Sequence, residues 1–174
     1  MSGHSKWATI KRSKGAADAK KGMLFTKLGK NISLAVKTGG GADPAFNFKL
    51  RMAIDKAREA AMPNDNIERA LSRGRGEEKN NIQEVTYEGY GPGGSAFIIE
   101  AITDNSNRTL QSVRNIFTKN SGRIGGQGSV AWMFDSELKP RQSIQPSEDN
   151  LAKIQILVDK FNEDEDVVNV HTNL

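Results

Sequence analysis

Basic residues are concentrated near the start of the chain, where they could bind the phosphates of a nucleic acid. Residues 1–40 include nine Lys or Arg side chains, and Asp18 is the only acid among them. Fixed cations bind a nucleic-acid backbone because they displace its condensed counterions, and this release supplies most of the non-specific affinity. The nucleic-acid-binding residues that we predict in this segment are Lys6, Trp7, Lys11, Arg12, Lys14, Lys20, Lys21, Lys27 and Lys30.

Two of these assignments have alternatives. The basic segment could be an ordinary solvated face, although such a face normally mixes both signs of charge. Trp7 could stack on a base, but packing onto its own domain is the favoured role for a single aromatic side chain.

A second basic group, Arg69, Arg73 and Arg75, follows the cluster Asn64-Asp65-Asn66. On a short helix these arginines could reach base edges or phosphates, as in a helix-turn-helix. The Asn-Asp-Asn cluster is also fully explained as the cap of that helix. We therefore predict nucleic-acid contact by the three arginines and treat recognition of a base sequence as the less favoured alternative.

The residues that catalysis or a metal site would need are missing or far apart. The chain has no Cys, which excludes a disulfide framework, a thiolate zinc site and a cysteine nucleophile. His4 and His171 lie at opposite ends of the chain without a paired spacing. Glu88 and Asp104 lie near predicted turns, but nothing marks them as a general acid and base. We therefore expect no enzymatic activity, no cofactor and no metal.

Two glycine-rich segments favour turns over phosphate binding. Gly91-Pro92-Gly93-Gly94 lacks the Lys and Ser or Thr of a P-loop, so a hairpin turn is favoured. Residues 122–128 predict a connecting loop between a helix and a strand, with Arg123 as a further candidate for RNA contact.

Charge divides the 174 residues into two parts of opposite sign. Residues 1–76 contain 16 bases and 6 acids, a net charge of +10, and residues 77–174 contain 9 bases and 15 acids, a net charge of −6. With 36% hydrophobic residues, two small domains are favoured over one large globule. No signal core and no run of about 20 apolar residues is present, so we expect a cytoplasmic protein outside the membrane, with a monomer favoured.

Helical spacing of apolar residues predicts three helices in residues 1–76, which we assign as a basic nucleic-acid-binding domain. The first runs from Ala16 to Lys37, and the second from an Asp43-Pro44 cap through Phe46 toward Met62. The third opens at the Asn-Asp-Asn cluster and closes at Gly74. Short turns between them predict a three-helix bundle.

Residues 77–174 predict an α+β domain. The runs 85–90 and 96–103 predict a hairpin, and the run 129–134 predicts a third strand after a helix capped at 104–107. Ser147 caps a further helix before a last strand at 167–171. A ferredoxin-like sheet with two helices on one face would bury the apolar sides of these strands and helices, so the expected fold is mixed α and β.

Several motifs in the right order resemble the YebC family, which includes the bacterial PmpR regulators and the mitochondrial translational activator of cytochrome oxidase. The motifs are Gly3-His4-Ser5-Lys6-Trp7, Phe25-Thr26-Lys27-Leu28, Met62-Pro63-Asn64-Asp65-Asn66-Ile67, Tyr87-Glu88-Gly89-Tyr90-Gly91-Pro92-Gly93-Gly94, and Thr103-Asp104-Asn105 with Asn107-Arg108-Thr109. The resemblance implies a third α+β domain inserted in the second, which is missing here between about residues 135 and 147.

The resemblance also implies a function in gene expression. Family members are described as DNA-binding transcriptional regulators, which is the function that we expect first. The alternative is a ribosome-associated translation factor that binds ribosomal RNA or tRNA and relieves stalling. A second alternative, from another class, is a protein-interaction module whose basic segment binds an acidic partner.

Overall fold

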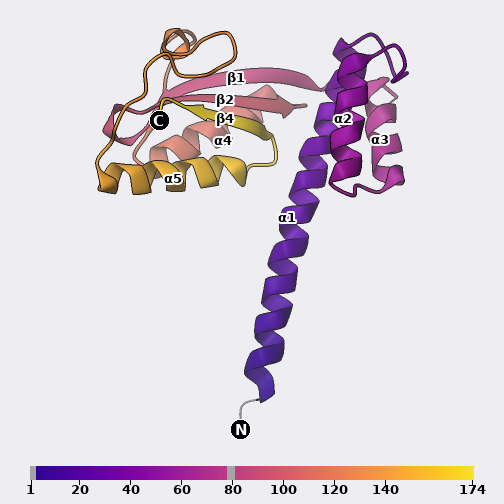
Figure 1. The fold of residues 1–174 in the computed structure, drawn as a ribbon, viewed down its shortest axis with the longest axis horizontal. Helices are drawn as coiled ribbons and strands as arrows, with labels where there is room; N and C mark the ends of the chain where they lie inside the picture. The colour runs from indigo at the N-terminus through magenta and orange to yellow at the C-terminus, as the bar shows by residue number, and fades with distance from the viewer. Residues whose placement is uncertain (1–2, 78–80) are drawn as a thin grey trace. The chain divides into compact units, whose positions relative to one another are not determined.

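The computed structural model describes residues 3–77 and 81–174, with side chains described from residue 15 onward (Figure 1). The chain divides after Glu77 into two compact units. Among the helices in the described part of the chain, none is both long enough and apolar enough to cross a membrane.

The first unit consists of three helices, as predicted. They are α1 (Gly3–Thr38), α2 (Phe48–Glu59) and α3 (Asn64–Gly74). The predicted start of α1 at Ala16 was wrong, because the helix continues back to Gly3. The core lies at the other end of α1, where Ile32 and Val36 pack against α2 and α3.

The predicted start of α2 at Asp43-Pro44 was wrong by one turn. Residues 44–46 form a turn instead, and Asn47 caps the helix by accepting a hydrogen bond from the Leu50 amide at 3.0 Å. The side chain of Phe46, which we expected in the apolar stripe, is 86% exposed. A tertiary contact opposes the earlier helix start, because the Asn47 side chain also donates a hydrogen bond to the Ala35 carbonyl near the end of α1.

The side-chain cap that we expected for α3 is also absent. The residue at the cap position is Pro63, which provides no side-chain hydrogen bond, and the helix begins directly at Asn64. Because Asn66 lies inside the first turn, its side chain is available to a neighbour on the helix surface.

The second unit is an antiparallel sheet with two long helices, so the predicted mixed α and β class is confirmed (Figure 1). Its elements are β1 (Gln83–Tyr90), β2 (Ala96–Thr103), α4 (Ser106–Lys119), β3 (Arg123–Ile124), α5 (Glu148–Asn162) and β4 (Val167–Thr172). The strand order is β3-β1-β2-β4, with the predicted β1–β2 hairpin at the centre. The hairpin turns through a short 3-10 helix at Pro92–Gly94.

The strand predicted at 129–134 was wrong. The third strand is the short β3, and a 3-10 turn at Ala131–Met133 replaces the expected one. Phe134 forms only an isolated bridge with Pro140. A short turn closes this bridge, because the Asp135 amide donates to the Lys139 carbonyl at 2.9 Å and the Arg141 amide donates to the Met133 carbonyl at 2.8 Å.

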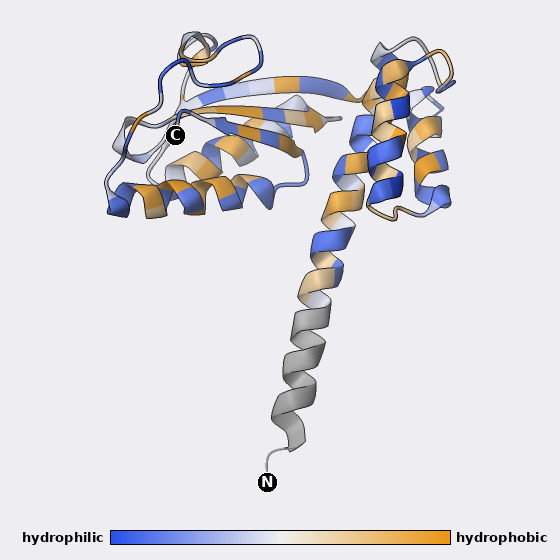
Figure 2. Cartoon of the chain, viewed as in Figure 1, coloured by the Kyte–Doolittle hydropathy of each residue, from blue (hydrophilic) through white to orange (hydrophobic). Residues whose placement is uncertain are grey.

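Both faces of the central strand β2 are buried, which agrees with its largely hydrophobic sequence (Figure 2). On one face α4 and α5 cover it, and the rings of Phe97, Phe117 and Phe161 meet with centroids 4.8–6.2 Å apart. On the other face Val130 and Phe134 cover Ile98. The segment after β3 is therefore part of the core of this unit.

Candidate nucleic-acid interface

Lysines of α1 form a row on the side of the helix away from the bundle core. Lys20, Lys27, Lys30 and Lys37 follow one another at steps of seven, three and seven residues, which keeps them on one side of an α-helix. The core residues of α1, such as Ile32, lie on the opposite side. Lys20 and Lys37 are exposed, and Lys27 and Lys30 are half-buried. The helix thus presents a row of four cations.

Lys21 does not belong to this row. Its Nζ lies 5.6 Å from the centroid of the Phe25 ring, one turn further along the helix, at the distance of a cation–π contact. Phe25 also lines a groove between α1 and α3, but Lys21 is not among the described residues that line it.

The groove between α1 and α3 has a volume of about 310 Å³. Phe25, Gly29, Met62 and Ala70 give it an apolar floor, and no acidic residue is among the described residues that line it. The remaining lining residues are Gly22, Thr26, Asn66, Arg69 and Arg73.

Close packing further along α1 fixes the position of α3. The buried Ser33 hydroxyl lies 3.0 Å from the Gly29 carbonyl oxygen and 2.8 Å from that of Ala70 on α3. At Gly74 a Cβ atom would lie 2.6 Å from Val36 Cβ, so only glycine permits this approach of the two helices. The helices are therefore clamped at one end of α3, and the groove lies beside the other part.

Arg69 and Arg73 lie one turn apart on α3 and both line the groove. Two contacts orient Arg69: its Nη2 donates to Asn66 Oδ1 at 2.9 Å and its Nε donates to the Asp65 carbonyl at 3.3 Å. A guanidinium has five N–H donors, so Arg69 retains donors for a phosphate. Arg75 follows the helix and forms a loose pair with Glu77, with Nη1 and Oε1 3.8 Å apart.

The predicted residues Lys6, Trp7, Lys11, Arg12 and Lys14 belong to the first turns of α1, but their side chains lie outside the described residues. Of the described candidates, Arg69 and Arg73 line the groove, and Lys20, Lys27 and Lys30 belong to the row along α1. Lys21 contacts the ring of Phe25, which lines the groove.

Sequence reasoning missed the exposure of Phe46 and Phe48, whose side chains are 86% and 65% exposed. Phe46 had been assigned to a buried stripe. The signal available in the sequence was Asn47, a strong helix cap that lies between the two rings and moves the helix start to Phe48.

Glu88 of the second unit is a structural acid. Its Oε1 accepts a hydrogen bond from the Gly128 amide at 2.6 Å, and its Oε2 accepts from Val130 at 2.7 Å and Ala131 at 2.8 Å. Burial raises the pKa of the Glu88 carboxyl, but the three backbone hydrogen bonds outweigh burial and hold the pKa below its ordinary value. The carboxylate therefore fixes the segment that follows β3.

Asp104 is also explained by structure. It accepts a hydrogen bond from Arg108 Nη2 at 2.9 Å, and the same nitrogen lies 3.1 Å from the buried Asp166. Asp166 accepts a further hydrogen bond from Thr109 at 2.9 Å, so this cluster joins the start of α4 to the start of β4. The hydrogen bonds that Arg108 donates to Asp166 and Asp104 raise its pKa, so it stays charged.

One groove of the second unit has no Lys or Arg among the described residues that line it. This groove, of about 360 Å³ beside β1 and α4, is lined by neutral residues and by Glu88. Within residues 15–77 and 81–174, no group of three or more His, Asp or Glu side chains is placed to hold a metal ion. Of these two grooves, only the one in the first unit has arginines among the described residues of its lining.

Comparison with known proteins identifies the family of this chain. Residues 5–77 match the family model of the TACO1/YebC protein N-terminal domain, and residues 82–138 match that of the TACO1/YebC second and third domain. A crystal structure of a conserved hypothetical protein from Aquifex aeolicus has the same fold, with a TM-score of 0.84 and 31% identity over 90% of each chain.

Curated bacterial relatives are similar over most of the chain. A "probable transcriptional regulatory protein" of Treponema denticola is 64% identical over 78% of this chain and 55% of its own length, and one of Natranaerobius thermophilus is 60% identical over 78% and 54%. The chain spans about half the length of these two relatives. A relative in Chlorobium phaeobacteroides is 52% identical over 99% of this chain and 70% of its own length. The resemblance seen in the sequence motifs is thereby confirmed, and the chain belongs to the TACO1/YebC family.

Proposed function

We propose that this chain is a nucleic-acid-binding regulator of gene expression and that its first unit binds the phosphate backbone. The observation that carries the proposal is the placement of cations in that unit: a row of lysines along α1, and a groove lined by Arg69 and Arg73 without an acid among its described residues. Phosphates bound there would release counterions, which gives affinity without any reading of sequence.

DNA is the target that we propose first. The Treponema and Natranaerobius relatives are named probable transcriptional regulatory proteins, and contacts to phosphates fix the position of a protein on a duplex. The acidic second unit, with a net charge of −6 over residues 77–174, would be repelled by phosphates, so we assign to it a contact with protein.

The test is the salt dependence of binding. We expect the affinity for a labelled 30-base-pair duplex to fall steeply with salt, and the triple variant K20Q/K21Q/R69Q to lose about three phosphate contacts. Because each contact contributes about 0.9 to the slope of log K against log salt, the slope should become shallower by about 2.7. Fluorescence anisotropy between 50 and 300 mM salt measures it.

The matched control is K119Q/K139Q/K153Q, which removes the same charge from exposed positions of the second unit. The control should bind as the wild type does. Equal slopes for the two triple variants would refute the assignment to the first unit, and binding by the wild type that is independent of salt would refute the proposal itself. Tighter binding to ribosomal RNA than to duplex DNA at equal salt would replace DNA with RNA as the target.

A further inference from the structure

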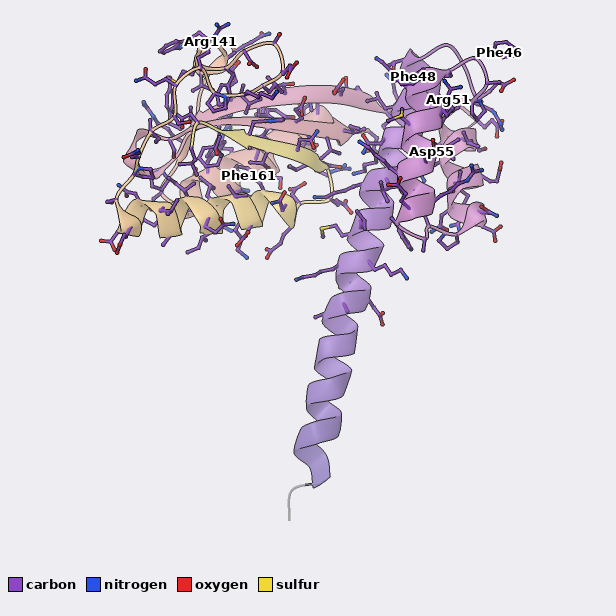
Figure 3. All side chains as sticks on the ribbon, viewed as in Figure 1. Phe46, Phe48, Arg51, Asp55, Arg141 and Phe161 are labelled. Carbon is purple, nitrogen blue, oxygen red and sulfur yellow. The ribbon has the colours of Figure 1, made fainter. Side chains whose placement is uncertain are left out.

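We propose that unpaired bases of the bound nucleic acid stack on the exposed rings of Phe46 and Phe48, which we together call the platform. This inference rests on the proposed function, because it concerns a second mode of contact with the same partner. The rings lie at the end of the first unit where α2 begins (Figure 3).

The fold makes little use of either ring. The Phe46 side chain is 86% exposed and that of Phe48 is 65% exposed, while Met52, one turn along α2 from Phe48, is 45% exposed. Large aromatic side chains contribute to stability mainly through burial, and these two contribute little of it. Exposed large apolar side chains that the fold does not bury can mark a binding surface.

A buried side chain holds the backbone between the two rings. Asn47 is 1% exposed, and its Nδ2 donates to the Ala35 carbonyl at 2.8 Å and to the Gly41 carbonyl at 2.7 Å. Its Oδ1 accepts from the Leu50 amide, so three hydrogen bonds tie one residue to α1, the loop and α2. Because Phe46 and Phe48 are its neighbours in sequence, both start from a fixed backbone and lose little freedom when a base stacks on them.

The charges around the platform favour a polyanion over an apolar partner. Arg51 Cζ lies 5.4 Å from the centroid of the Phe48 ring, and Arg51 Nη1 lies within 3.4 Å of the Pro44 carbonyl oxygen. The exposed residues of α2 include four bases, Lys49, Arg51, Lys56 and Arg58, and two acids, Asp55 and Glu59, and Asp43 is exposed in the segment before α2. Aromatic rings beside cations are the combination that binds single-stranded nucleic acid, since bases stack while the cations contact phosphates.

The first unit of a second copy fits the platform less well. Residues 1–76 carry a net charge of +10, so two such units placed face to face would repel each other. A nucleic acid supplies both the flat apolar surface and the opposite charge.

The test compares single-stranded and duplex probes with the full chain. In F46A/F48A we expect the affinity for a labelled 12-nucleotide single strand to fall about tenfold or more, because stacking on each ring is removed. The affinity for a duplex of the same sequence should change less than about twofold, and the salt slope should stay constant because no cation is removed. In F46W/F48W the single-strand affinity should be retained, and tryptophan fluorescence should be quenched on binding.

The control is L151A/I156A, which removes two exposed apolar side chains from α5 of the second unit. It should bind both probes as the wild type does. Unchanged single-strand binding by F46A/F48A, or an equal loss for both probes, would refute the platform. A wild type that binds neither probe would refute the proposed function instead. Concentration-dependent dimers that F46A/F48A abolishes would assign the rings to self-association and overturn the inference.

Discussion

Replacing Glu88 with Gln tests whether a buried carboxylate holds the segment after β3. The Glu88 side chain accepts three backbone hydrogen bonds of 2.6–2.8 Å, and the residue is 7% exposed. In E88Q the amide oxygen can keep the two hydrogen bonds from Val130 and Ala131 as neutral ones. The amide nitrogen then faces the Gly128 N–H, so two donors meet and the third hydrogen bond is lost.

The cost follows from the change in each hydrogen bond. A hydrogen bond to a charged group contributes about 1.5–3 kcal/mol and one between neutral groups about 1 kcal/mol. Losing one charged bond and weakening two others lowers the free energy of unfolding by about 3 kcal/mol. The charge no longer has to be buried in E88Q, and this gain reduces the expected loss to about 2 kcal/mol.

Urea unfolding followed by Trp132 fluorescence measures this loss. Trp132 lies in the same segment, with its Nε1 3.1 Å from the Ser129 carbonyl oxygen, and a Trp7→Phe background removes the other tryptophan signal. The control is E84Q, which removes the same charge from an exposed position of the same strand. Exposed substitutions of this kind change stability little, so equal free energies of unfolding for E88Q and E84Q would contradict the structural role of the carboxylate.

The acid dependence provides a second check on Glu88. Its pKa is lower in the folded state than the ordinary value of 4.5, so its stabilisation is present above that value and is lost as pH falls through the lowered pKa. The difference between wild type and E88Q should therefore persist from pH 7 to pH 5 and shrink below about pH 4. A difference that stays constant down to pH 2 would show that the charge is not responsible.

Two further predictions concern the anchors of the two units. N47A should lower the free energy of unfolding by about 3 kcal/mol, because it removes the cap of α2 and two hydrogen bonds to backbone carbonyls. Circular dichroism in urea measures this loss. A loss below about 1 kcal/mol would contradict the role of Asn47 as an anchor. R108A should lower the free energy of unfolding by about 2 kcal/mol, because it removes the cation beside the buried Asp166. K160A breaks an exposed ion pair of similar length and should lower the free energy of unfolding clearly less. Equal losses for the two variants in urea unfolding would contradict the role of burial.

The sequence predicted the elements whose pattern is local. The helices α4 and α5, the caps at Asn105 and Ser147 and the hairpin turn at 91–94 each depend on residues close in the chain, and the structure confirms them. The error at residues 129–134 depends on a distant partner. The run 129–134 has the composition of a strand, but its amides bind the carboxylate of Glu88, far earlier in the chain, instead of a neighbouring strand.

The same distinction applies to the candidate site. The excess of bases in residues 1–76 is visible in composition alone. The groove is not, because it requires α1 and α3 to meet at Ser33 and Gly74, which are distant in the sequence. The helical spacing places Phe46 in the core, but Asn47 caps the helix that begins at Phe48 and also donates hydrogen bonds to Ala35 and Gly41, which leaves Phe46 outside the helix.

The short turn between Phe134 and Pro140 gives this fold a natural point for extension. Phe134 and Pro140 stand at the two ends of this turn and form a β-bridge with each other. The two ends of the turn therefore lie side by side. Domains commonly have their termini close together, and lengthening a surface loop costs little closure entropy. A domain inserted into this turn would leave the four-stranded sheet and the helices α4 and α5 in place. The turn is thus a place where related chains can differ greatly in length while keeping one architecture.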